Sequence, residues 1–302
     1  TRISTRPESD PVMTTALSKA DKKAAKGKLK KYRKEGTLGL WTGFGMLGAM
    51  IIAGAIIPRV SKFDPNEPSL IPMMAPSRTN FFGTDSLGRD IFVRVFDAVF
   101  VDLGTAIIGV SIPLVVGTII GTLLGISRNK RVNSLVGSLI DGINAFPFLI
   151  FVIALIAFIG PGIPSIILAL SLVNWARYAR IARTRAVVVN QQGYVEAART
   201  LGFSKPRILF KHIIPNVSSE TRAYALSDFI IVIIAVAALS FLGLGSKPPQ
   251  AEWGAMIKDG AGLLPIDIWW PTVFPGLALC WAGISIAFIA EGLNRRLREV
   301  AV

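Results

Sequence analysis

The sequence contains one cysteine and one histidine among 302 residues, and charged residues make up only 17% of it. One cysteine excludes a disulfide framework and a cysteine-based metal site. The solitary His212 has no neighbouring ligands with which to hold a metal ion. The chain also lacks a Gly-x-x-x-x-Gly-Lys-Ser/Thr loop that could bind nucleotide phosphates. These absences argue against a metalloenzyme and against a chain that hydrolyses ATP itself.

Long apolar runs are what the sequence has in abundance. Hydrophobic residues make up 52% of the chain, and a membrane span needs about 20 apolar residues to cross a hydrocarbon core of about 30 Å. Charge-free stretches occupy 36–58, 103–127, 142–176, 229–246 and 268–290. The third is too long for one span and is interrupted by Gly160-Pro161-Gly162. We therefore predict an all-α membrane protein with six spans, at 37–57, 103–126, 136–159, 163–179, 227–245 and 271–291.

The distribution of lysine and arginine predicts the orientation of these spans. With both termini inside, the inner segments hold 26 of the 33 basic residues and the outer segments hold 7. Cytoplasmic segments carry the excess of basic residues in membrane proteins. Both termini are therefore predicted to be cytoplasmic. The Lys-rich stretch 19–34 is interpreted as a lipid-surface anchor, because no soluble basic domain suggests nucleic-acid binding.

The predicted spans divide the chain into five parts. Near the N-terminus the sequence shows no short apolar core followed by a small-residue cleavage site, so we expect no cleavable signal peptide. The expected parts are a basic cytoplasmic tail at 1–36, a first span at 37–57, an outer loop at 58–102, a membrane core at 103–291 and a cytoplasmic C-terminal tail at 292–302.

The segment 180–226, a cytoplasmic loop within the core, has the clearest local pattern. Residues 196–201 predict a short helix carrying two small residues, and Gly202 can adopt the left-handed conformation that ends a helix. Ser204 can cap a second helix, and Pro206 stands where that helix would begin. Small residues let a helix lie close against a partner. We interpret this segment as a docking element.

The spacing within this loop resembles a known family. Glu-Ala-Ala begins at position 196, a glycine follows six positions after the glutamate, and a proline follows thirteen positions later. This pattern resembles the EAA loop of binding-protein-dependent ABC importer permeases, whose coupling helices lie in a groove of the ATPase subunit. The proline also predicts a break before the chain re-enters the membrane. The resemblance implies that the ATPase-coupling residues are Glu196, Ala197, Ala198, Arg199, Gly202 and Pro215.

Three further stretches narrow the resemblance. These are Phe-Gly-Thr-Asp-Ser-Leu-Gly-Arg-Asp at 82–90, Leu-Ser-Phe-Leu-Gly-Leu-Gly at 239–245, and Pro-Pro at 248–249 with Trp-Gly at 253–254. Together they resemble the C-type permease of dipeptide and oligopeptide importers, including the nickel and glutathione branches. Members commonly carry a glutamate shortly before Leu-Ser-Phe-Leu-Gly, where this chain has Val236-Ala237-Ala238, and the C-terminal match is loose. These departures affect the inference of the substrate and leave the family resemblance unchanged.

The resemblance implies a type I ABC importer permease in the bacterial cytoplasmic (inner) membrane. It would form half of a channel for dipeptides or oligopeptides, with nickel or glutathione as alternative cargoes. Its partners would be a second, B-type permease, one or two cytoplasmic ATPase subunits, an extracytoplasmic solute-binding protein and the lipid bilayer. The chain itself would be no enzyme and would hold no cofactor or metal, because the ATPase subunits bind ATP and Mg²⁺.

Two regions outside the loop are also candidates for function. The 83–90 stretch predicts Asp85 as an N-cap and an Asp85–Arg89 ion pair, followed by an amphipathic helix at the outer surface before the second span. At membrane depth, a carboxylate normally faces the bundle interior or a water-filled cavity. Asp141 therefore either pairs with an arginine such as Arg177 or Arg180 or lies near the translocation path. Asn144 and Asn174 are further candidates for the path or its gate.

Two other classes of protein were weighed. A self-sufficient secondary transporter or channel often shows internal repeats, and no repeat is evident in this sequence. An intramembrane enzyme would need paired carboxylates or a metal cluster at one depth, and neither pattern is apparent in the sequence. A transporter active without an ATPase would favour the first alternative.

Overall fold

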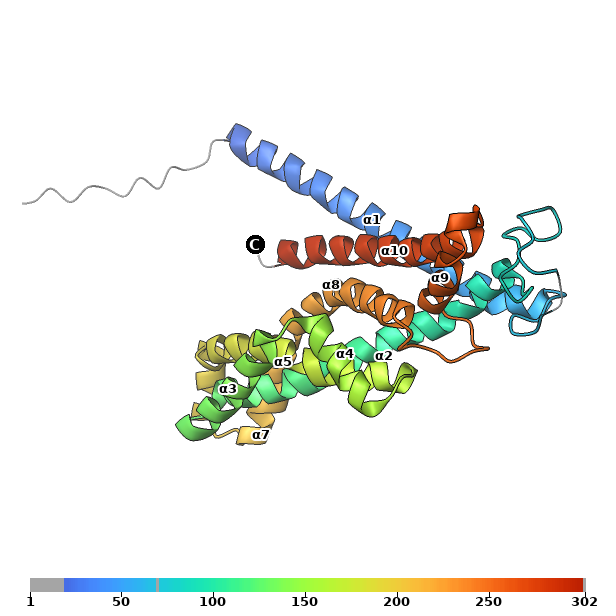
Figure 1. The fold of residues 1–302 in the computed structure, drawn as a ribbon. Helices are drawn as coiled ribbons and strands as arrows, with labels where there is room; N and C mark the ends of the chain where they lie inside the picture. Colours follow the sequence, from blue (N-terminus) through green and yellow to red (C-terminus); the bar gives the residue numbers. More distant parts are fainter. Residues whose placement is uncertain (1–18, 69–70, 301–302) are drawn as a thin grey trace, which may run out of the picture.

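The computed structural model describes residues 19–68 and 71–300, with side chains described for 36–68 and 71–295 (Figure 1). Helices are the regular structure of these parts, and their one β-type feature is an isolated antiparallel bridge between Thr84 and Asp90. The predicted all-α class is confirmed. The long helices are α1 (Lys19–Val60), α2 (Ile91–Ile126), α3 (Lys130–Ala145), α4 (Phe148–Ile159), α5 (Ile163–Asn190), α8 (Ile214–Phe241) and α10 (Trp270–Val300). The short ones are α6 (Gly193–Thr200), α7 (Lys205–Ile208), the π-helical turn η1 (Leu209–Ile213), α9 (Trp253–Ala261) and the 3₁₀ turn η2 (Leu264–Ile266).

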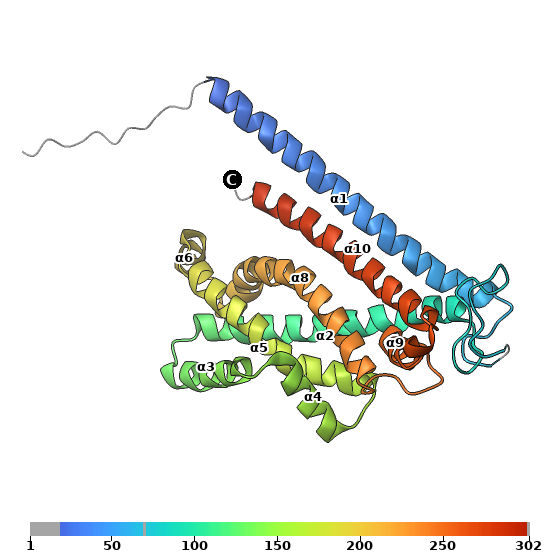
Figure 2. The ribbon, with the colours of Figure 1, turned by 45° about the horizontal axis from the view of Figure 1, so that its top comes forward.

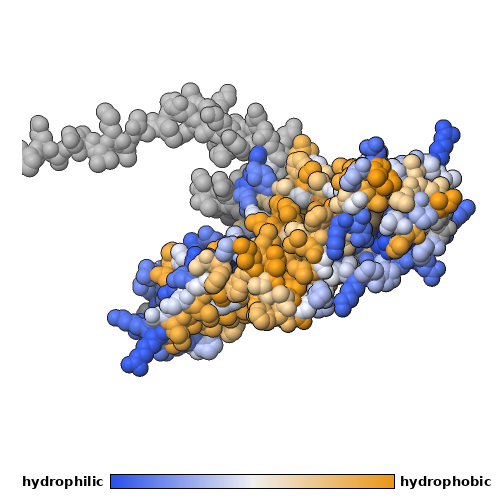
Figure 3. All heavy atoms as spheres, viewed as in Figure 1, coloured by the Kyte–Doolittle hydropathy of each residue, from blue (hydrophilic) through white to orange (hydrophobic). Residues whose placement is uncertain are grey.

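The elongated molecule has an apolar middle and two hydrophilic ends. Figures 1 and 2 show α1 and α10 side by side, next to a group formed by α2, α5 and α8. The described chain ends and α6 lie at one end of the molecule, and the 61–90 segment and α9 lie at the other (Figure 2). Figure 3 shows hydrophobic residues gathered between these ends. This distribution suits a protein that crosses a bilayer.

Four helices of the described chain are long and apolar enough to span a membrane, at Gly36–Val60, Ile91–Ile126, Lys205–Phe241 and Trp270–Arg295. A fifth candidate is the pair α3 and α4, which is bent by 98°. Predicted spans 37–57, 103–126 and 271–291 each fall inside one of these helices. The predicted six are therefore not all recovered, because polar residues in α5 lower its apolarity and the third predicted span is broken.

The break in the predicted third span, 136–159, lies at Phe146-Pro147. Phe146 is extended, with φ −82° and ψ 143°, as expected of a residue that precedes proline. The prediction of one continuous helix here was wrong. The turn at 160–162 was predicted correctly, since Gly160 and Gly162 have φ values of 99° and 148°, which glycine adopts without steric penalty.

The outer part of α2 also differs from the prediction. No turn separates an amphipathic helix from the second span, because α2 is one helix from Ile91 to Ile126. Its apolar residues Ile91, Val95 and Val99 are buried within the chain. The apolar stripe that suggested a helix lying on the surface packs against the protein.

Close helix contacts organise the membrane core. A Cβ atom on Gly117 or Gly121 of α2 would lie 2.5 Å from the Trp175 carbonyl oxygen or 2.2 Å from that of Ala179 in α5. Gly125, one turn further along, meets Ala186 in the same way. Residues four apart share one face of a helix. The glycine row therefore lets α2 and α5 pack backbone against backbone as one unit.

Candidate functional site

The helix α6 lies at the end of the molecule that also holds the described chain ends (Figure 2). Its residues alternate between two environments. Val195 and Ala198 are buried, with exposed fractions of 0% and 4%, whereas Glu196 and Ala197 are exposed. The two faces give α6 an inner side that fixes it to the protein and an outer side that is free to meet another surface.

The inner side of α6 belongs to a small apolar cluster. Its buried members come from α5, α6, α7, η1 and α8, and they are Ala182, Ala186, Val189, Val195, Ala198, Ile208, Ile213 and Val217. The contact of Ala198 with an ATPase stays a prediction. The structure shows that its side chain packs within this cluster. The cluster joins α6 to both long helices that lead into the membrane core.

The end of α6 is a Schellman motif, which confirms the predicted left-handed conformation of Gly202. Gly202 has φ +80°. Its N–H donates to the Arg199 carbonyl at 3.0 Å, and the Phe203 N–H donates to the Ala198 carbonyl at 3.1 Å. These are the two hydrogen bonds that define the motif. Gly202 thereby fixes the direction in which the chain leaves α6.

The chain after α6 follows the predicted order only in part. Ser204 occupies the N-cap position of α7 and Pro206 lies in its first turn, but the Ser204 side chain makes no capping hydrogen bond. The break expected at Pro215 is absent. Pro215 lies in the first turn of α8, where a helix tolerates proline. The irregularity instead lies one turn earlier, in η1, and helical backbone continues from Lys205 to Phe241.

A polar contact and an aromatic group support α6. The Arg199 guanidinium donates to the Asn190 side-chain oxygen, so Arg199 bridges α6 and the end of α5. The half-buried His212 ring lies 6.2 Å from the Phe203 ring and 6.4 Å from the Tyr194 ring, measured between centroids. His212 therefore has a packing role. In the described part of the chain no three or more His, Cys, Asp or Glu residues gather to hold a metal ion.

The structure separates the predicted path residues. Asp141 in α3 pairs with Arg180 in α5 at 2.6 Å, and both side chains are more than half exposed. Asn144 donates to the Ile140 carbonyl of its own helix at 2.7 Å. Asn174, in contrast, is fully buried, and neither of its amide atoms has a hydrogen-bond partner among the described residues. Asp141 and Asn144 thus lie at or near the surface of the chain, whereas Asn174 lies inside it.

Sequence reasoning missed Asp228, which lies one residue before a charge-free run. This carboxylate is fully buried in α8 and accepts a hydrogen bond from the Tyr178 hydroxyl of α5 at 2.8 Å. A second contact joins Thr118 in α2 to Thr221 in α8 at 3.0 Å. These bonds tie together the helices on both sides of α6. The signal in the sequence was an acidic residue at the start of a predicted span.

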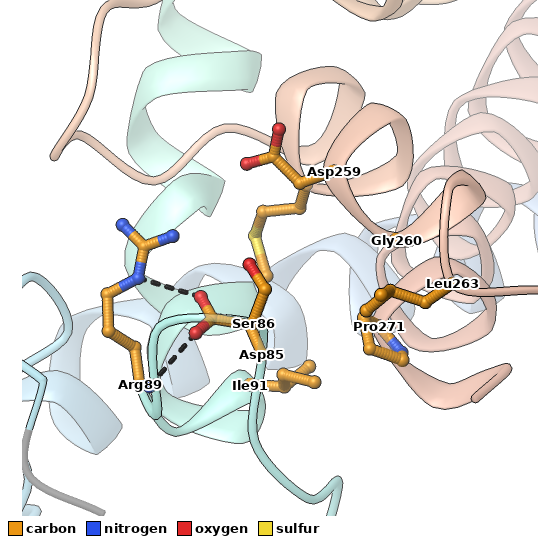
Figure 4. Close-up of a pocket in the computed structure, with 9 residues that line it drawn as sticks. Asp85, Ser86, Arg89, Ile91, Asp259, Gly260, Leu263 and Pro271 are labelled. Atoms are coloured by element: carbon orange, nitrogen blue, oxygen red, sulfur yellow. Dashed lines mark hydrogen bonds and ion pairs between the residues drawn. The ribbon is translucent and has the colours of Figure 1, made fainter. Parts of the chain in front are cut away.

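The opposite end of the molecule contains a small pocket between the 83–90 turn and α9 (Figure 4). The predicted Asp85–Arg89 ion pair is present at 2.7 Å. Asp85 does not cap α2, however. It accepts from the N–H groups of Leu87 and Arg89 within the turn. The N-cap of α2 is Asp90, which accepts from the Val93 N–H at 2.9 Å.

Comparison with known proteins identifies the family that this chain matches. Residues 117–299 match the family described as "Binding-protein-dependent transport system inner membrane component". A peptide transport system permease protein of Brucella suis biovar 1 (strain 1330) is 34% identical over 253 residues, which cover 83% of this chain and 84% of that protein.

A glutathione transport system permease protein of Escherichia coli O6:K15:H31 (strain 536 / UPEC) is 37% identical over 224 residues, covering 74% of this chain and 73% of that protein. Among solved structures, the crystal structure of an amino acid ABC transporter with histidines aligns with a TM-score of 0.50 at 19% identity. The alignment covers 67% of this chain and 94% of that one, and it concerns the fold alone.

Proposed function

Because the chain belongs to the family of binding-protein-dependent transport system inner membrane components, it is a permease of the inner membrane, and we propose that it forms half of a channel for dipeptides or oligopeptides. A B-type permease would supply the other half. An extracytoplasmic solute-binding protein would deliver the cargo, and one or two cytoplasmic ATPase subunits would bind ATP and Mg²⁺ and drive transport. The relative named for peptide transport supports the cargo, and the relative named for glutathione supports an alternative. Nickel is the third alternative cargo, and the sequence motifs support it.

We propose that the chain crosses the membrane six times with both termini and α6 in the cytoplasm. The excess of basic residues in the segments on that side supports the orientation. The position of α6 at the same end as the described chain ends supports it as well. On this proposal α5 and the bent pair α3–α4 supply the remaining crossings, with their polar surfaces covered by the second permease.

The proposed coupling rests on one observation, that α6 has one buried face and one exposed face. We propose that Glu196, Ala197 and the Gly202 turn contact the ATPase, while Val195 and Ala198 hold α6 to the permease. Movement of the ATPase would then move α6 and, through the apolar cluster under it, the ends of α5 and α8. Arg199 would hold α6 against α5 through Asn190, and Pro215 would begin α8.

The exposed Asp141–Arg180 pair and Asn144 are proposed to lie near the inner mouth of the path. Their exposure on the α3–α5 side of the chain supports this position. Asn174 is buried inside the chain, so we propose that it affects the gate through helix packing and does not line the path.

Two single-cysteine variants test the proposed docking surface. In a Cys280→Ala background of the complete importer, Ala197→Cys should cross-link to the ATPase subunit, and Ala198→Cys should not, because only residue 197 is exposed. An Ala197→Asp variant should assemble normally yet lose uptake per ATP hydrolysed. Capture of the ATPase through residue 198 but not residue 197 would overturn the proposed orientation of α6.

The alternative of a self-sufficient transporter has a direct test. The purified chain, reconstituted alone in liposomes, should not accumulate a tripeptide or glutathione, whereas the complete importer with ATP should. Uptake by the chain alone, driven by an ion gradient, would refute the importer assignment.

A further inference from the structure

Two acidic side chains are buried together at the outer end of the bundle, where α2, the end of α8 and the start of α9 meet. Asp102 of α2 is 1% exposed, and Glu252, directly before α9, is fully buried. Glu252 acts electrostatically on Asp102. Among residues with described side chains, the ion pairs involve neither carboxylate. Two buried like charges are strongly unfavourable without a counter-charge, which these side chains do not supply.

Each carboxylate uses one oxygen to hold the backbone and leaves the other available. Asp102 accepts from the Trp253 N–H at 3.1 Å through Oδ2, and Glu252 accepts from the Ser246 N–H at 2.8 Å through Oε2. Asp102 Oδ1 and Glu252 Oε1 are buried without a hydrogen-bond partner in the described chain. The backbone bonds therefore fix both carboxylates in place before any ligand binds.

Two serine hydroxyls join this group. Ser240 is 1% exposed and its Oγ has no hydrogen-bond partner among the described residues, although serine in a helix commonly bonds a carbonyl of the preceding turn. A Cβ atom on Gly245 would lie 2.1 Å from Ser240 Oγ and 2.6 Å from Glu252 Oε2. The Ser240 hydroxyl and the Glu252 carboxylate therefore both lie against Gly245, next to each other. Ser246 Oγ is likewise buried and unpartnered within the described residues.

We propose that Asp102, Glu252, Ser240 and Ser246 form a binding site for a divalent cation of the Ca²⁺ or Mg²⁺ class. Such hard cations prefer oxygen ligands, which is what these four residues present. A charge of +2 balances two carboxylates. The cation would join α2, the end of α8 and the start of α9. This site lies at the opposite end of the molecule from α6, so it is separate from any Mg²⁺ bound with ATP.

Metal binding and thermal unfolding of the purified complete importer test the proposal. After EDTA treatment and gel filtration, the protein is equilibrated with CaCl₂, with MgCl₂ or with NaCl of the same ionic strength. We expect one equivalent of Ca²⁺ or Mg²⁺ per permease chain by elemental analysis, and a higher melting temperature than in NaCl. The divalent salt that raises the melting temperature more identifies the cation.

Three variants decide between a cation site and a merely structural pair. Asp102→Asn with Glu252→Gln should abolish the bound equivalent and the melting shift, and in EDTA it should be at least as stable as the parent, because the repulsion is gone. The control Asp141→Asn, at an exposed carboxylate, should keep both effects. Should the double variant fail to assemble, Ser240→Ala, which keeps the Cβ atom, should weaken cation binding severalfold. Absence of a bound divalent cation, or an equal melting shift in parent and double variant, would overturn the proposal.

Discussion

Replacement of Gly202 by alanine provides the sharpest test of how α6 is held. A Cβ atom at this position would meet no other atom within 4 Å, so the substitution introduces no clash. Its effect comes from the backbone alone, because φ is +80°. An L-residue in the left-handed region loses about 1–2 kcal/mol relative to glycine, and the lower entropy of the unfolded chain offsets about 0.4–1 kcal/mol of this.

The expected net effect is about 1 kcal/mol, or roughly a fivefold lower ratio of the native to the opened exit from α6. Because the Gly202 and Phe203 N–H groups both lose their geometry, the Schellman motif opens and α6 loses its fixed orientation. We expect Gly202→Ala to lower peptide uptake per ATP hydrolysed severalfold, without lowering the amount of assembled importer.

The assay measures uptake and ATP hydrolysis together in liposomes that contain the complete importer. Gly193→Ala is the matched control, since Gly193 also has open space around it but no left-handed φ. Gly202→Asn should be milder than Gly202→Ala, because asparagine tolerates the left-handed region. Parental coupling in Gly202→Ala, or equal losses in the control at Gly193, would show that backbone conformation at residue 202 does not determine coupling.

Three other substitutions test contacts that stabilise the helices of the bundle, each by thermal unfolding of the purified importer. Gly121→Ala places a Cβ atom 2.2 Å from the Ala179 carbonyl oxygen and should destabilise by about 1–3 kcal/mol; Gly142→Ala, with open space around it, should not, and equal effects would contradict the close α2–α5 contact. Tyr178→Phe leaves the buried Asp228 carboxylate without its 2.8 Å hydrogen bond and should destabilise by about 1–3 kcal/mol, whereas loss of the exposed Tyr194 hydroxyl should have little effect; a neutral Tyr178→Phe would refute the role of this bond. Asp90→Ala removes the N-cap of α2 and should destabilise by about 1 kcal/mol, and Asp90→Asn, which can still cap, should retain most of the stability; an Asn variant as unstable as the Ala variant would point to charge as the cause.

Local backbone chemistry was predictable from the sequence where one residue determines it. Gly202 ends α6 in the left-handed conformation, and Gly160 and Gly162 turn the chain between α4 and α5, as expected. Pro206 lies in the first turn of α7, and Asp85 pairs with Arg89, four residues later. In each case the atoms that determine the local conformation or contact belong to a few consecutive residues.

Features that depend on distant contacts were not predictable in the same way. Ala198 looked available to a partner, but residues of α5 and α8 cover it. The stripe at the start of α2 looked like a surface helix because its buried partners are distant in sequence. Pro147 could either bend a span slightly or break it, and the 98° bend depends on how α3 and α4 pack. Asp228 escaped notice because its hydrogen-bond partner, Tyr178, lies 50 positions earlier.

The length of α2 has a mechanical consequence. Its 36 residues extend about 54 Å at 1.5 Å per residue, well beyond the hydrocarbon thickness of about 30 Å. One end holds the Trp253 indole through the Val95 carbonyl, and the other packs against α5 at Gly125, close to α6. A helix held at both ends transmits a displacement from one anchor to the other as far as it stays straight, and Pro113 is the point within α2 where it can bend. On the proposed orientation, a tilt of α2 would therefore carry movement at the cytoplasmic face to the side where cargo arrives.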